Sequence, residues 1–253
     1  MSCEYYEDAV AAYDRLAPFY AIYSKKREAY LRGVERLIAA QSRGAHSLLD
    51  LGAGNGTRAL RIAAAAGIDT VILLEPSSRM AESRSNSTEL WQMRAEDLRS
   101  ENVIQRFDVI TCLWNVLGHV PAIGRERVLR TCEQLLSPTG RIFLDLNHRY
   151  NARSYGWTAT CARWLRDVFL RDTRAGDVTA TWKIGETQIS TYGHVFTHRE
   201  LAALVGAAGL EIEERIVIDY NDGYVRRLPW LGNLLYVLRC RSRIESSSAP
   251  ATS

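Results

Sequence analysis

An apolar run that ends in aspartate and continues into spaced glycines most constrains how this chain can fold. The run Leu48-Leu49-Asp50-Leu51 is followed directly by Gly52-Ala53-Gly54-Asn55-Gly56. Glycine accepts positive φ and has no Cβ, so the backbone there can turn sharply and lie close to a ligand. A buried strand that breaks into such a loop, with a helix expected over 57–66, predicts a site for a nucleoside-bearing cofactor in an α/β fold.

A second expected strand, over residues 70–75, ends in Glu75-Pro76. In α/β folds, an acidic residue that closes this strand about 20 residues beyond the glycines accepts hydrogen bonds from the ribose hydroxyls. We therefore expect Glu75 to bind an unphosphorylated ribose. The spacing G-x-G-x-G differs from the dinucleotide fingerprint G-x-G-x-x-G, which makes a dehydrogenase less favoured than the alternatives below.

Strands and helices are expected to alternate along the middle of the chain. We expect strands at 47–51, 70–75, 89–93, 107–113 and 141–146, and helices at 57–66, 77–85 and 124–136. A turn over 137–140, Ser-Pro-Thr-Gly, is expected to separate the last of these helices from its strand. This alternation predicts a mostly parallel sheet with helices on both faces.

The expected domain organisation is an N-terminal cap, a cofactor-binding domain that contains this core, and a C-terminal tail. Residues 1–44 have helical apolar spacing and predict an N-terminal helical cap, and residues 45–243 form the cofactor-binding domain. Within it, residues 147–196 form a small insertion over the acceptor site, with two short strands around Gly185. A capping box of Thr197 and Glu200 opens a helix at 198–208, strands follow at 211–220 and 234–240, and residues 244–253 are expected to form a disordered tail.

Four motifs resemble those of class I S-adenosylmethionine-dependent methyltransferases: residues 50–56 (DLGAGNG), 75–80 (EPSSRM), 95–98 (AEDL) and 107–110 (FDVI). The resemblance covers roughly residues 13–240. It implies a Rossmann-like, seven-stranded, mostly parallel sheet with an antiparallel last strand. It also implies S-adenosyl-L-methionine as the cofactor and S-adenosyl-L-homocysteine as the product.

By that resemblance, the cofactor-binding residues come from the ends of successive strands. Asp50 is expected to bond the loop amides or to reach the ammonium group of the cofactor through water. Ala95 offers a backbone amide to the adenine, and the carboxylate comes from Glu96 or from Asp97, because Arg94 occupies a position that is often Asp. The expected set is Asp50, Gly52, Ala53, Gly54, Asn55, Gly56, Glu75, Pro76, Met80, Ala95, Glu96, Leu113 and Trp114.

The acceptor region is weakly similar to that of glycine and sarcosine N-methyltransferases. Asn115 and His119 have the same spacing as an Asn and a His there, and the stretch around Asn147 and Arg149 is similar with a shifted spacing. The expected substrate-binding residues are Tyr13, Tyr20, Asn115, Asn147, Arg149 and Tyr192. Candidate catalytic residues are His119, Tyr20 and His194, and each also has a purely structural interpretation: a His that supports a loop, or a Tyr that packs in a core.

Composition limits the partners that we expect. The net charge is +3, the five cysteines form no CxxC pair, and no His/Cys spacing suits a metal, so we expect no metal site. The acidic, aromatic N-terminus is unlike a secretion signal, and no apolar run reaches 18 residues. We therefore expect a cytoplasmic protein without a membrane partner, either a monomer or a homodimer.

The function predicted from these features is in-line methyl transfer to a nitrogen or oxygen of a small-molecule acceptor, catalysed mainly by positioning. One alternative is an RNA (tRNA) methyltransferase that grips phosphates with arginines, although acidic residues interleave with them and make a nucleic-acid partner less favoured. The arginines concerned are Arg153, Arg163, Arg166, Arg171 and Arg174. Another alternative is a non-catalytic, cofactor-binding partner subunit.

Overall fold

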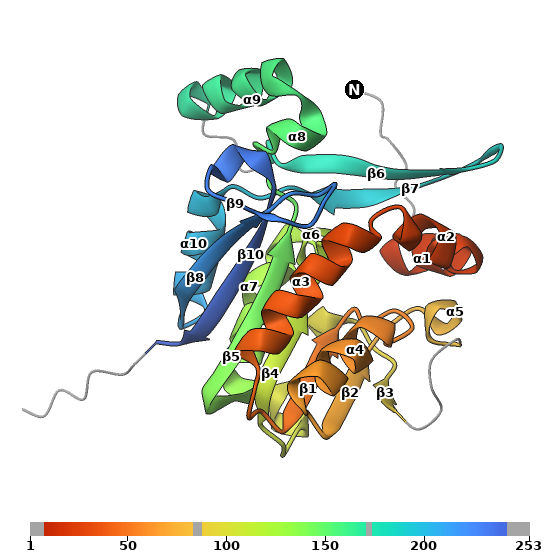
Figure 1. Ribbon diagram of the computed structural model, residues 1–253, viewed down its shortest axis with the longest axis vertical. Coiled ribbons are helices and arrows are strands. Elements are labelled where there is room, and N and C mark those ends of the chain that lie inside the picture. Colours follow the sequence, from red (N-terminus) through yellow and green to blue (C-terminus); the bar gives the residue numbers. More distant parts are fainter. Residues whose placement is uncertain (1–7, 83–87, 171–173, 242–253) are drawn as a thin grey trace, which may run out of the picture.

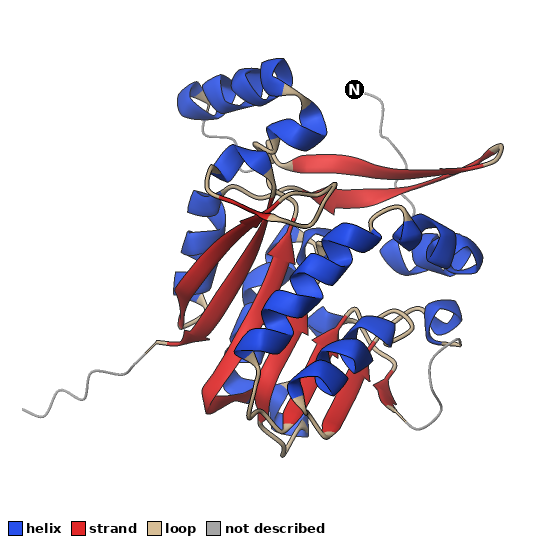
Figure 2. Ribbon diagram, in the orientation of Figure 1, coloured by secondary structure: helices blue, strands red, loops and turns tan. Residues whose placement is uncertain are grey.

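The computed structural model describes residues 8–82, 88–170 and 174–241, which fold around a mostly parallel, eight-stranded sheet (Figures 1 and 2). The strand order is β3-β2-β1-β4-β5-β10-β8-β9. Strands β1 to β5 run parallel, whereas β10 is antiparallel to both β5 and β8. The strands are β1 Ser47–Leu51, β2 Thr70–Leu74, β3 Glu89–Trp91, β4 Phe107–Cys112, β5 Leu136–Leu146, β8 Leu210–Ile218, β9 Val225–Arg226 and β10 Asn233–Cys240.

Helices cover both faces of this sheet, so its central strands are buried throughout. On one face, α4 (Thr57–Ala66) packs on β1 and β2, and α3 (Glu28–Gln41) packs on α4 and β8, through a core that includes Tyr30, Ile38 and Ile62. On the other, α7 (Ala122–Leu135) and α10 (His198–Ala207) contribute Leu129 and Leu201 to a second core. Burial on both faces explains why the strands read as continuous apolar runs.

The carboxyl ends of the parallel strands meet a group of short helices and a hairpin (Figure 1). From the N-terminal region come α1 (Ala9–Leu16), η1 (Ala17–Phe19) and α2 (Tyr20–Lys25). The hairpin of β6 (Asp177–Ile184) and β7 (Thr187–His194) packs on α1 through a small apolar cluster. That cluster consists of Ala12, Leu16, Trp182 and Ile189.

The remaining elements are short, apart from one helix on the outer surface. These are α5 (Ser78–Ala81), η2 (Ala95–Asp97), η3 (Ser100–Asn102), α6 (Val116–His119), α8 (Ala152–Tyr155), α9 (Trp157–Phe169) and η4 (Pro229–Leu231). Helix α9 projects from the body of the fold beside α8 (Figure 1). It belongs to the predicted insertion, whose hairpin lies nearer the sheet.

The sequence predicted the order of the elements, and three details differ. The expected turn at 137–140 lies within β5, where the pairing with β4 shifts between Phe107 and Val109. Ser137 Oγ donates to Asp108 Oδ1 (2.9 Å) and holds this segment against β4. Helix α3, expected in the cap, packs on the sheet, and the two-residue β9 adds an eighth strand. Part of the predicted helix at 77–85 and the predicted tail at 244–253 lie outside the described residues.

Candidate active site

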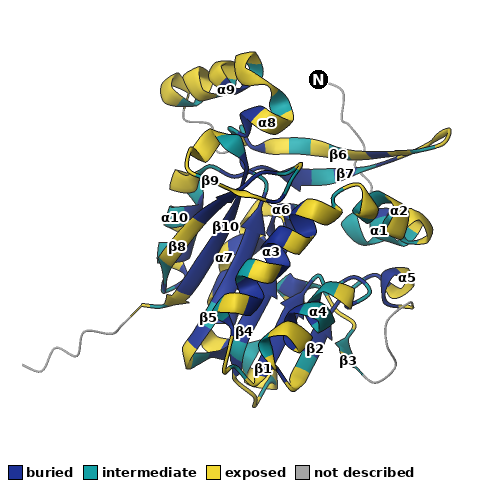
Figure 3. Ribbon diagram, in the orientation of Figure 1, coloured by how far each residue is buried: buried dark blue, intermediate teal, exposed yellow. Residues whose placement is uncertain are grey.

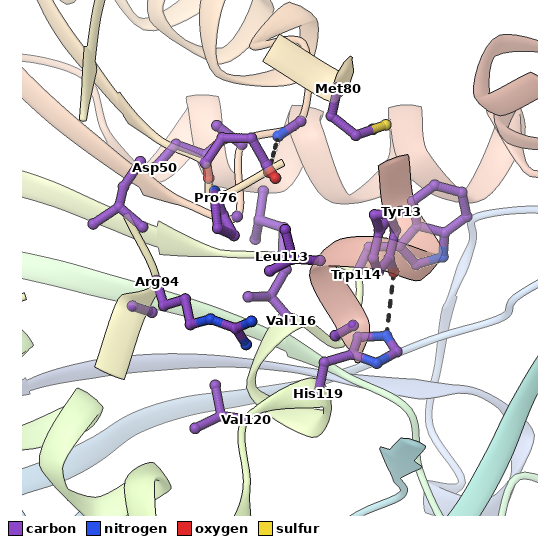
Figure 4. Close-up of a pocket in the computed structure, with 18 of the residues that line it drawn as sticks. Tyr13, Asp50, Pro76, Met80, Arg94, Leu113, Trp114, Val116, His119 and Val120 are labelled. Atoms are coloured by element: carbon purple, nitrogen blue, oxygen red, sulfur yellow. Dashed lines mark hydrogen bonds between the residues drawn. The ribbon is translucent and has the colours of Figure 1, made fainter. Parts of the chain in front are cut away.

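A cavity opens at the carboxyl ends of β1, β2 and β4, beneath α1 and α2 (Figure 4). Including its open mouth it encloses about 930 Å³, within the range of small-molecule and cofactor sites. It is lined by Ala9, Val10, Tyr13, Tyr20, Asp50, Gly52, Ala53, Gly54, Arg58, Leu74, Glu75, Pro76, Met80, Arg94, Ala95, Glu96, Leu113, Trp114, Val116, His119 and Val120. Fourteen of the residues that the sequence analysis proposed are therefore brought together here.

The glycine loop forms the floor of the cavity. Gly52 and Gly54 have φ values of +69° and +59°, which favour glycine. A Cβ on Gly52 would lie 2.5 Å from a methyl group of Val116, so the loop and α6 are packed without room for a side chain. The amides of Gly52 and Ala53 donate to the carbonyl of Leu74 (2.8 and 3.1 Å), which ties the loop to the end of β2.

One expectation for Asp50 is wrong. Asp50 was predicted to bond the loop amides, but the amides of Gly52 and Ala53 donate to the Leu74 carbonyl. Asp50 instead accepts a hydrogen bond from Thr111 Oγ1 on the neighbouring β4 (2.7 Å). Its carboxyl group is buried, and this burial raises the pKa of Asp50 to about 6. Asp50 still faces the cavity, where a cationic group would stabilise its ionised form.

Glu75 lies where the sequence predicted the ribose-binding acid. It lines the cavity, and its two oxygens accept from the amides of Gly54 and Ser77, both at 2.8 Å. Burial raises the pKa of Glu75 to about 7, although both amide bonds favour the carboxylate. Each carboxylate oxygen accepts more than one hydrogen bond, so Glu75 retains capacity for two hydroxyl donors.

Arg58, which the sequence analysis missed, lines the same cavity from the first turn of α4. Its side chain is largely buried, and its Nε and Nη2 have no hydrogen-bond partner among the described residues. The nearest carboxylate, on Glu35, lies 3.6 Å from Nε. A buried guanidinium with unpartnered donors is costly unless an anion pairs with it. The signal in the sequence was an arginine two residues after the last glycine of the loop.

The third strand brings Ala95 and Glu96 to the cavity, as the resemblance implied. Arg94, noted in the sequence as a departure, also lines the cavity, and its Nη2 contacts both carboxylate oxygens of Asp8 (2.7 and 2.8 Å). This ion pair joins the residue before α1 to the loop after β3. Met80, from α5, closes the cavity over the glycine loop (Figure 4).

The loop after β4 has a backbone shape that the sequence did not predict. Trp114 and Asn115 both have positive φ, +57° and +65°, which is uncommon outside glycine. Asp145 holds them there: its carboxylate accepts from the Trp114 amide (2.9 Å) and its carbonyl accepts from the Asn115 amide (2.9 Å). Tyr30 donates to the other carboxylate oxygen of Asp145. This left-handed bend places Leu113 and Trp114 along the cavity.

His119 faces the cavity with one of its tautomers fixed. Its Nδ1 lies 2.8 Å from the carbonyl oxygen of Tyr192, which only accepts, so Nδ1 carries the proton. Tyr13 then donates to the lone pair of Nε2 across 3.2 Å (Figure 4). Burial lowers the pKa of His119 and favours the neutral imidazole.

Aromatic side chains surround this pair. Tyr23 stacks on Trp114 with ring centroids 5.6 Å apart, and Tyr20 meets the same indole edge to face at 5.8 Å. Trp182 of the hairpin packs against Tyr13 at 5.4 Å. Burial raises the pKa of Tyr20 above its usual value, so its phenol is a hydrogen-bond donor at neutral pH.

Five predicted acceptor-site residues do not line the cavity. The Asn115 amide joins two backbones, donating to His194 O (3.1 Å) and accepting from Asn147 N (3.0 Å). Arg149 is buried against Asp167, with Nε and Oδ2 3.0 Å apart. Arg149 is thus paired within the insertion, whereas the contacts of the other four join the insertion to the loop after β4, to α7, to α10 or to β10. The five are Asn115, Asn147, Arg149, Tyr192 and His194.

The other members of this group have similar internal partners. Asn147 Oδ1 accepts from Asn233 (2.9 Å), and the Tyr192 phenol lies between Arg125 and Asp177 (both 2.7 Å). His194 is fully buried, with its ring nitrogens 2.7 Å from Asp177 and 2.7 Å from Glu200. Half of the predicted capping box is present, since Thr197 Oγ1 accepts from the Glu200 amide (3.1 Å). The Glu200 carboxylate, which was expected to reach back to Thr197, contacts His194 instead.

Asn55 and Gly56 shape the start of α4 and do not line the cavity. Asn55 Oδ1 accepts from the Thr57 amide (3.2 Å), and Gly56 has a φ of +73°. A Cβ on Gly56 would lie 2.4 Å from a methyl group of Leu73, so this glycine permits close packing of the helix on β2. Among the described residues, no group of three His, Cys, Asp or Glu side chains is placed to hold a metal, and no helix could cross a membrane.

The sheet order, the glycine loop and the acid closing the second strand define a methyltransferase of the S-adenosylmethionine-dependent class. The chain belongs to the methyltransferase-domain family, whose model matches residues 23–215. The ubiquinone biosynthesis O-methyltransferase of Pseudomonas syringae pv. tomato is 29% identical over 179 residues, which cover 69% of this chain and 68% of that protein.

Solved structures have the same fold. An S-adenosylmethionine-dependent methyltransferase from Clostridium acetobutylicum has a TM-score of 0.63 at 13% identity, covering 89% of this chain and 98% of that one. The 1,6-didemethyltoxoflavin-N1-methyltransferase of Burkholderia thailandensis, with 1,6-didemethyltoxoflavin and S-adenosylhomocysteine bound, has a TM-score of 0.60 at 16% identity and covers 96% and 94%. At these identities, the likeness concerns the fold.

Proposed function

We propose that this enzyme transfers the methyl group of S-adenosylmethionine to an oxygen or nitrogen of a small-molecule acceptor, with His119 as the proton acceptor. The observation that carries the proposal is the neutral His119 imidazole, which faces the cavity with its Nε2 lone pair toward Tyr13. A hydroxyl acceptor gains most from such a base, because an oxygen attacks far better once its proton is removed.

The residues present fit the cofactor. Glu75 has free acceptor capacity for the two ribose hydroxyls, and the glycine loop leaves backbone surface bare for the nucleoside. We assign the methionine carboxylate to Arg58, whose buried Nε and Nη2 lack hydrogen-bond partners. Asp50 lies in the same cavity and suits the ammonium group. When bound, the cofactor supplies an electrophilic methyl group on a sulfonium.

The protein's own contribution is placement and the removal of water. Tyr13, Tyr20 and Trp114 line the cavity with aromatic surface against which a flat or apolar acceptor packs. Holding donor and acceptor in line at attack distance is the main requirement of this displacement, because it needs no covalent intermediate. Rings that exclude water also prevent hydrolysis of the methyl donor.

Proton removal is assigned to His119. The Tyr192 carbonyl keeps the proton on Nδ1, so Nε2 remains the basic atom. In the proposed complex, the acceptor hydroxyl takes the place of the Tyr13 phenol at Nε2 and passes its proton there as the methyl group is transferred. An amine acceptor that arrives uncharged attacks through its lone pair and needs His119 only for the proton released afterwards.

The contacts of the insertion favour this function over RNA methylation. Arg153 bonds Asp219 (3.0 Å), and Arg163 stacks on the Tyr155 ring at 4.2 Å, so two of the arginines proposed for phosphates have internal partners. Two of the proteins named above, the ubiquinone biosynthesis O-methyltransferase and the 1,6-didemethyltoxoflavin-N1-methyltransferase, have names that refer to small molecules. A non-catalytic partner subunit is disfavoured by a base that faces an open cavity.

The test is turnover with a labelled methyl donor. The purified enzyme is incubated with methyl-labelled S-adenosylmethionine and an extract of host metabolites, and the compound that gains the label is identified by mass. We expect one small molecule to be labelled, with the label on oxygen or nitrogen, and S-adenosylhomocysteine to form in equal amount. Label that appears only in tRNA, or no turnover despite cofactor binding, would reject the proposal.

A further inference from the structure

Helix α9 is amphipathic, but its polar side faces the protein and its apolar side faces outward. Thr160 and Asp167 lie on the inner side, where Thr160 is buried and Asp167 contacts Arg149 and Tyr150. The outer side is apolar and exposed along most of the helix (Figure 3). Its large exposed residues are Trp157, Trp164, Leu165, Val168 and Phe169, followed by Leu170 at the C-cap.

The apolar surface continues onto a second segment, residues 224–231. Trp157 of α9 and Trp230 of η4 are in edge-to-face contact, with ring centroids 6.1 Å apart. Besides Trp230, this segment exposes Tyr224, Val225 and Leu228. We call the combined surface of residues 157–170 and 224–231 the outer patch. Exposed apolar surface that extends over two neighbouring elements indicates an interaction site.

The charges of the outer patch are almost all positive. Its two segments contain four arginines and a single carboxylate, Asp167. Oδ2 of that carboxylate contacts Arg149 and Tyr150, and its Oδ1 lies 3.5 Å from Arg166 Nε. Arg166 has 48% of its side chain exposed, and Arg227 is also exposed. Arg226 is paired with Asp219 and Asp222. A partner that covers this surface therefore meets aromatic and aliphatic groups beside the exposed guanidinium groups of Arg166 and Arg227.

We propose that the outer patch binds the surface of an anionic lipid bilayer, with α9 lying parallel to the membrane plane. A helix with aromatic and aliphatic residues on its outer side and arginines beside them suits the boundary between headgroups and acyl chains. Tryptophan and tyrosine favour this boundary, and anionic headgroups attract arginine. Binding to the membrane surface requires no membrane-spanning helix, so it is compatible with the absence of such a helix among the described residues.

Charge disfavours the two other occupants. A second copy packed on the same surface would place Arg166 and Arg227 of both copies in one interface, where each copy offers four arginines but a single carboxylate, the largely buried Asp167. An RNA would need many phosphate contacts, because these supply most of its affinity. The outer side of α9 offers mainly apolar groups instead.

The test uses the full chain without cofactor, so its outcome does not depend on the proposed function. Co-sedimentation compares vesicles of phosphatidylcholine mixed with phosphatidylglycerol against vesicles of phosphatidylcholine alone. We expect binding to the anionic vesicles, which weakens as salt increases. The double variant Leu165→Gln/Phe169→Gln should bind about tenfold more weakly or worse, and Arg166→Gln/Arg227→Gln should lose the preference for anionic lipid.

The matched control is Ile104→Gln/Ile123→Gln, which removes two exposed apolar side chains outside the outer patch. It should bind vesicles like the wild type, and circular dichroism should show all variants folded. Absence of vesicle binding, or equal loss in the control, would overturn the proposal. So would a concentration-dependent dimer abolished by the Leu165/Phe169 variant, or salt-sensitive tRNA binding that replaces vesicle binding.

Discussion

The phenol of Tyr13 and the imidazole of His119 lie 3.2 Å apart across the cavity, although 106 residues separate them in the sequence. The pair joins the first helix of the chain to the loop that follows β4. Because Tyr192 fixes the proton on Nδ1, the phenol contacts the one basic atom of the ring. The N-terminal helix α1 is thereby in direct contact with the residue proposed to accept a proton.

Substitution of His119 separates its two interactions. Asn at this position retains a donor for the Tyr192 carbonyl but has no basic nitrogen near Tyr13, whereas Ala loses both. We expect His119→Asn to lower kcat about 100-fold or more while the affinity for S-adenosylmethionine stays within about twofold. Initial rates and isothermal titration measure the two effects. If His119→Asn retained wild-type kcat, the residue would have a structural role alone.

Arg58 is predicted to hold the carboxylate of the cofactor, and Arg61 is its matched control. Both arginines contact Glu35, yet Arg58 alone of the two lines the cavity. Losing a charge-assisted hydrogen bond should weaken S-adenosylmethionine binding about 10- to 100-fold in Arg58→Gln, with little change in Arg61→Gln. Methylthioadenosine, which lacks the carboxylate, should bind Arg58→Gln and wild type alike. Equal weakening of both ligands would contradict the assignment.

Glu75 should make cofactor binding depend on pH. Its pKa is raised to about 7 in the unliganded protein, so below this pH most molecules carry a protonated Glu75 that must lose its proton to accept both hydroxyls. Affinity should therefore rise about tenfold between about pH 6 and about pH 8. Glu75→Gln should bind more weakly and lose this part of the pH dependence. Titration calorimetry at several pH values measures both, and the same slope in the variant would disprove the link.

The same shift has a consequence for stability. Because the pKa of Glu75 is higher in the folded chain than in the unfolded chain, the folded state binds more protons between about pH 4.5 and about pH 7. The contribution of Glu75 to stability is greatest below this window and falls as pH rises through it. Urea unfolding measures this effect. As pH rises through that range, any excess in the free energy of unfolding of the wild type over that of Glu75→Gln should shrink or reverse.

His194 is predicted to stabilise the fold without taking part in the chemistry. Both ring nitrogens face carboxylates, on Asp177 of β6 and Glu200 of α10. His194→Ala leaves the two carboxylates without this partner. Because Asp177 is 36% exposed and Glu200 is 27% exposed, water partly replaces the lost contacts, and we expect a loss of about 2 kcal/mol in the free energy of unfolding. His46→Ala, at a position whose side chain is 81% exposed, is the control. Denaturant unfolding measures the loss, and a folded variant without activity would contradict the structural role.

The cofactor half of the site was predictable because its signals are local. A glycine loop between a buried strand and a helix needs positive φ at fixed positions, and Glu75 follows at the end of the next strand. The loop at Trp114 and Asn115 was not predictable. These two non-glycine residues have positive φ, and hydrogen bonds to Asp145 in the next strand stabilise this conformation. Such a bend depends on tertiary contacts that no short segment encodes.

The acceptor half was predicted less well for a related reason. Asn115 and Arg149 were chosen by residue type and by resemblance, and both side chains instead have internal partners. Asn115 bonds the backbone of the insertion, and Arg149 pairs with Asp167 within the insertion. Polar side chains where segments meet often form hydrogen bonds with buried backbone groups. The residue type alone does not show whether a side chain has this structural role or binds a ligand. Arg58 was overlooked for the opposite reason, since its unpartnered nitrogens appear only in three dimensions.

Glu75 holds Gly54 and Ser77 by their amides even without a ligand, so the glycine loop and the start of α5 keep a fixed separation. The surface proposed to bind the sugar is therefore positioned by hydrogen bonds of the protein itself, which reduces the chain freedom that binding would remove. Evolution can consequently remodel the aromatic roof for new acceptors while the donor half keeps its shape, because the two halves are anchored to different strands.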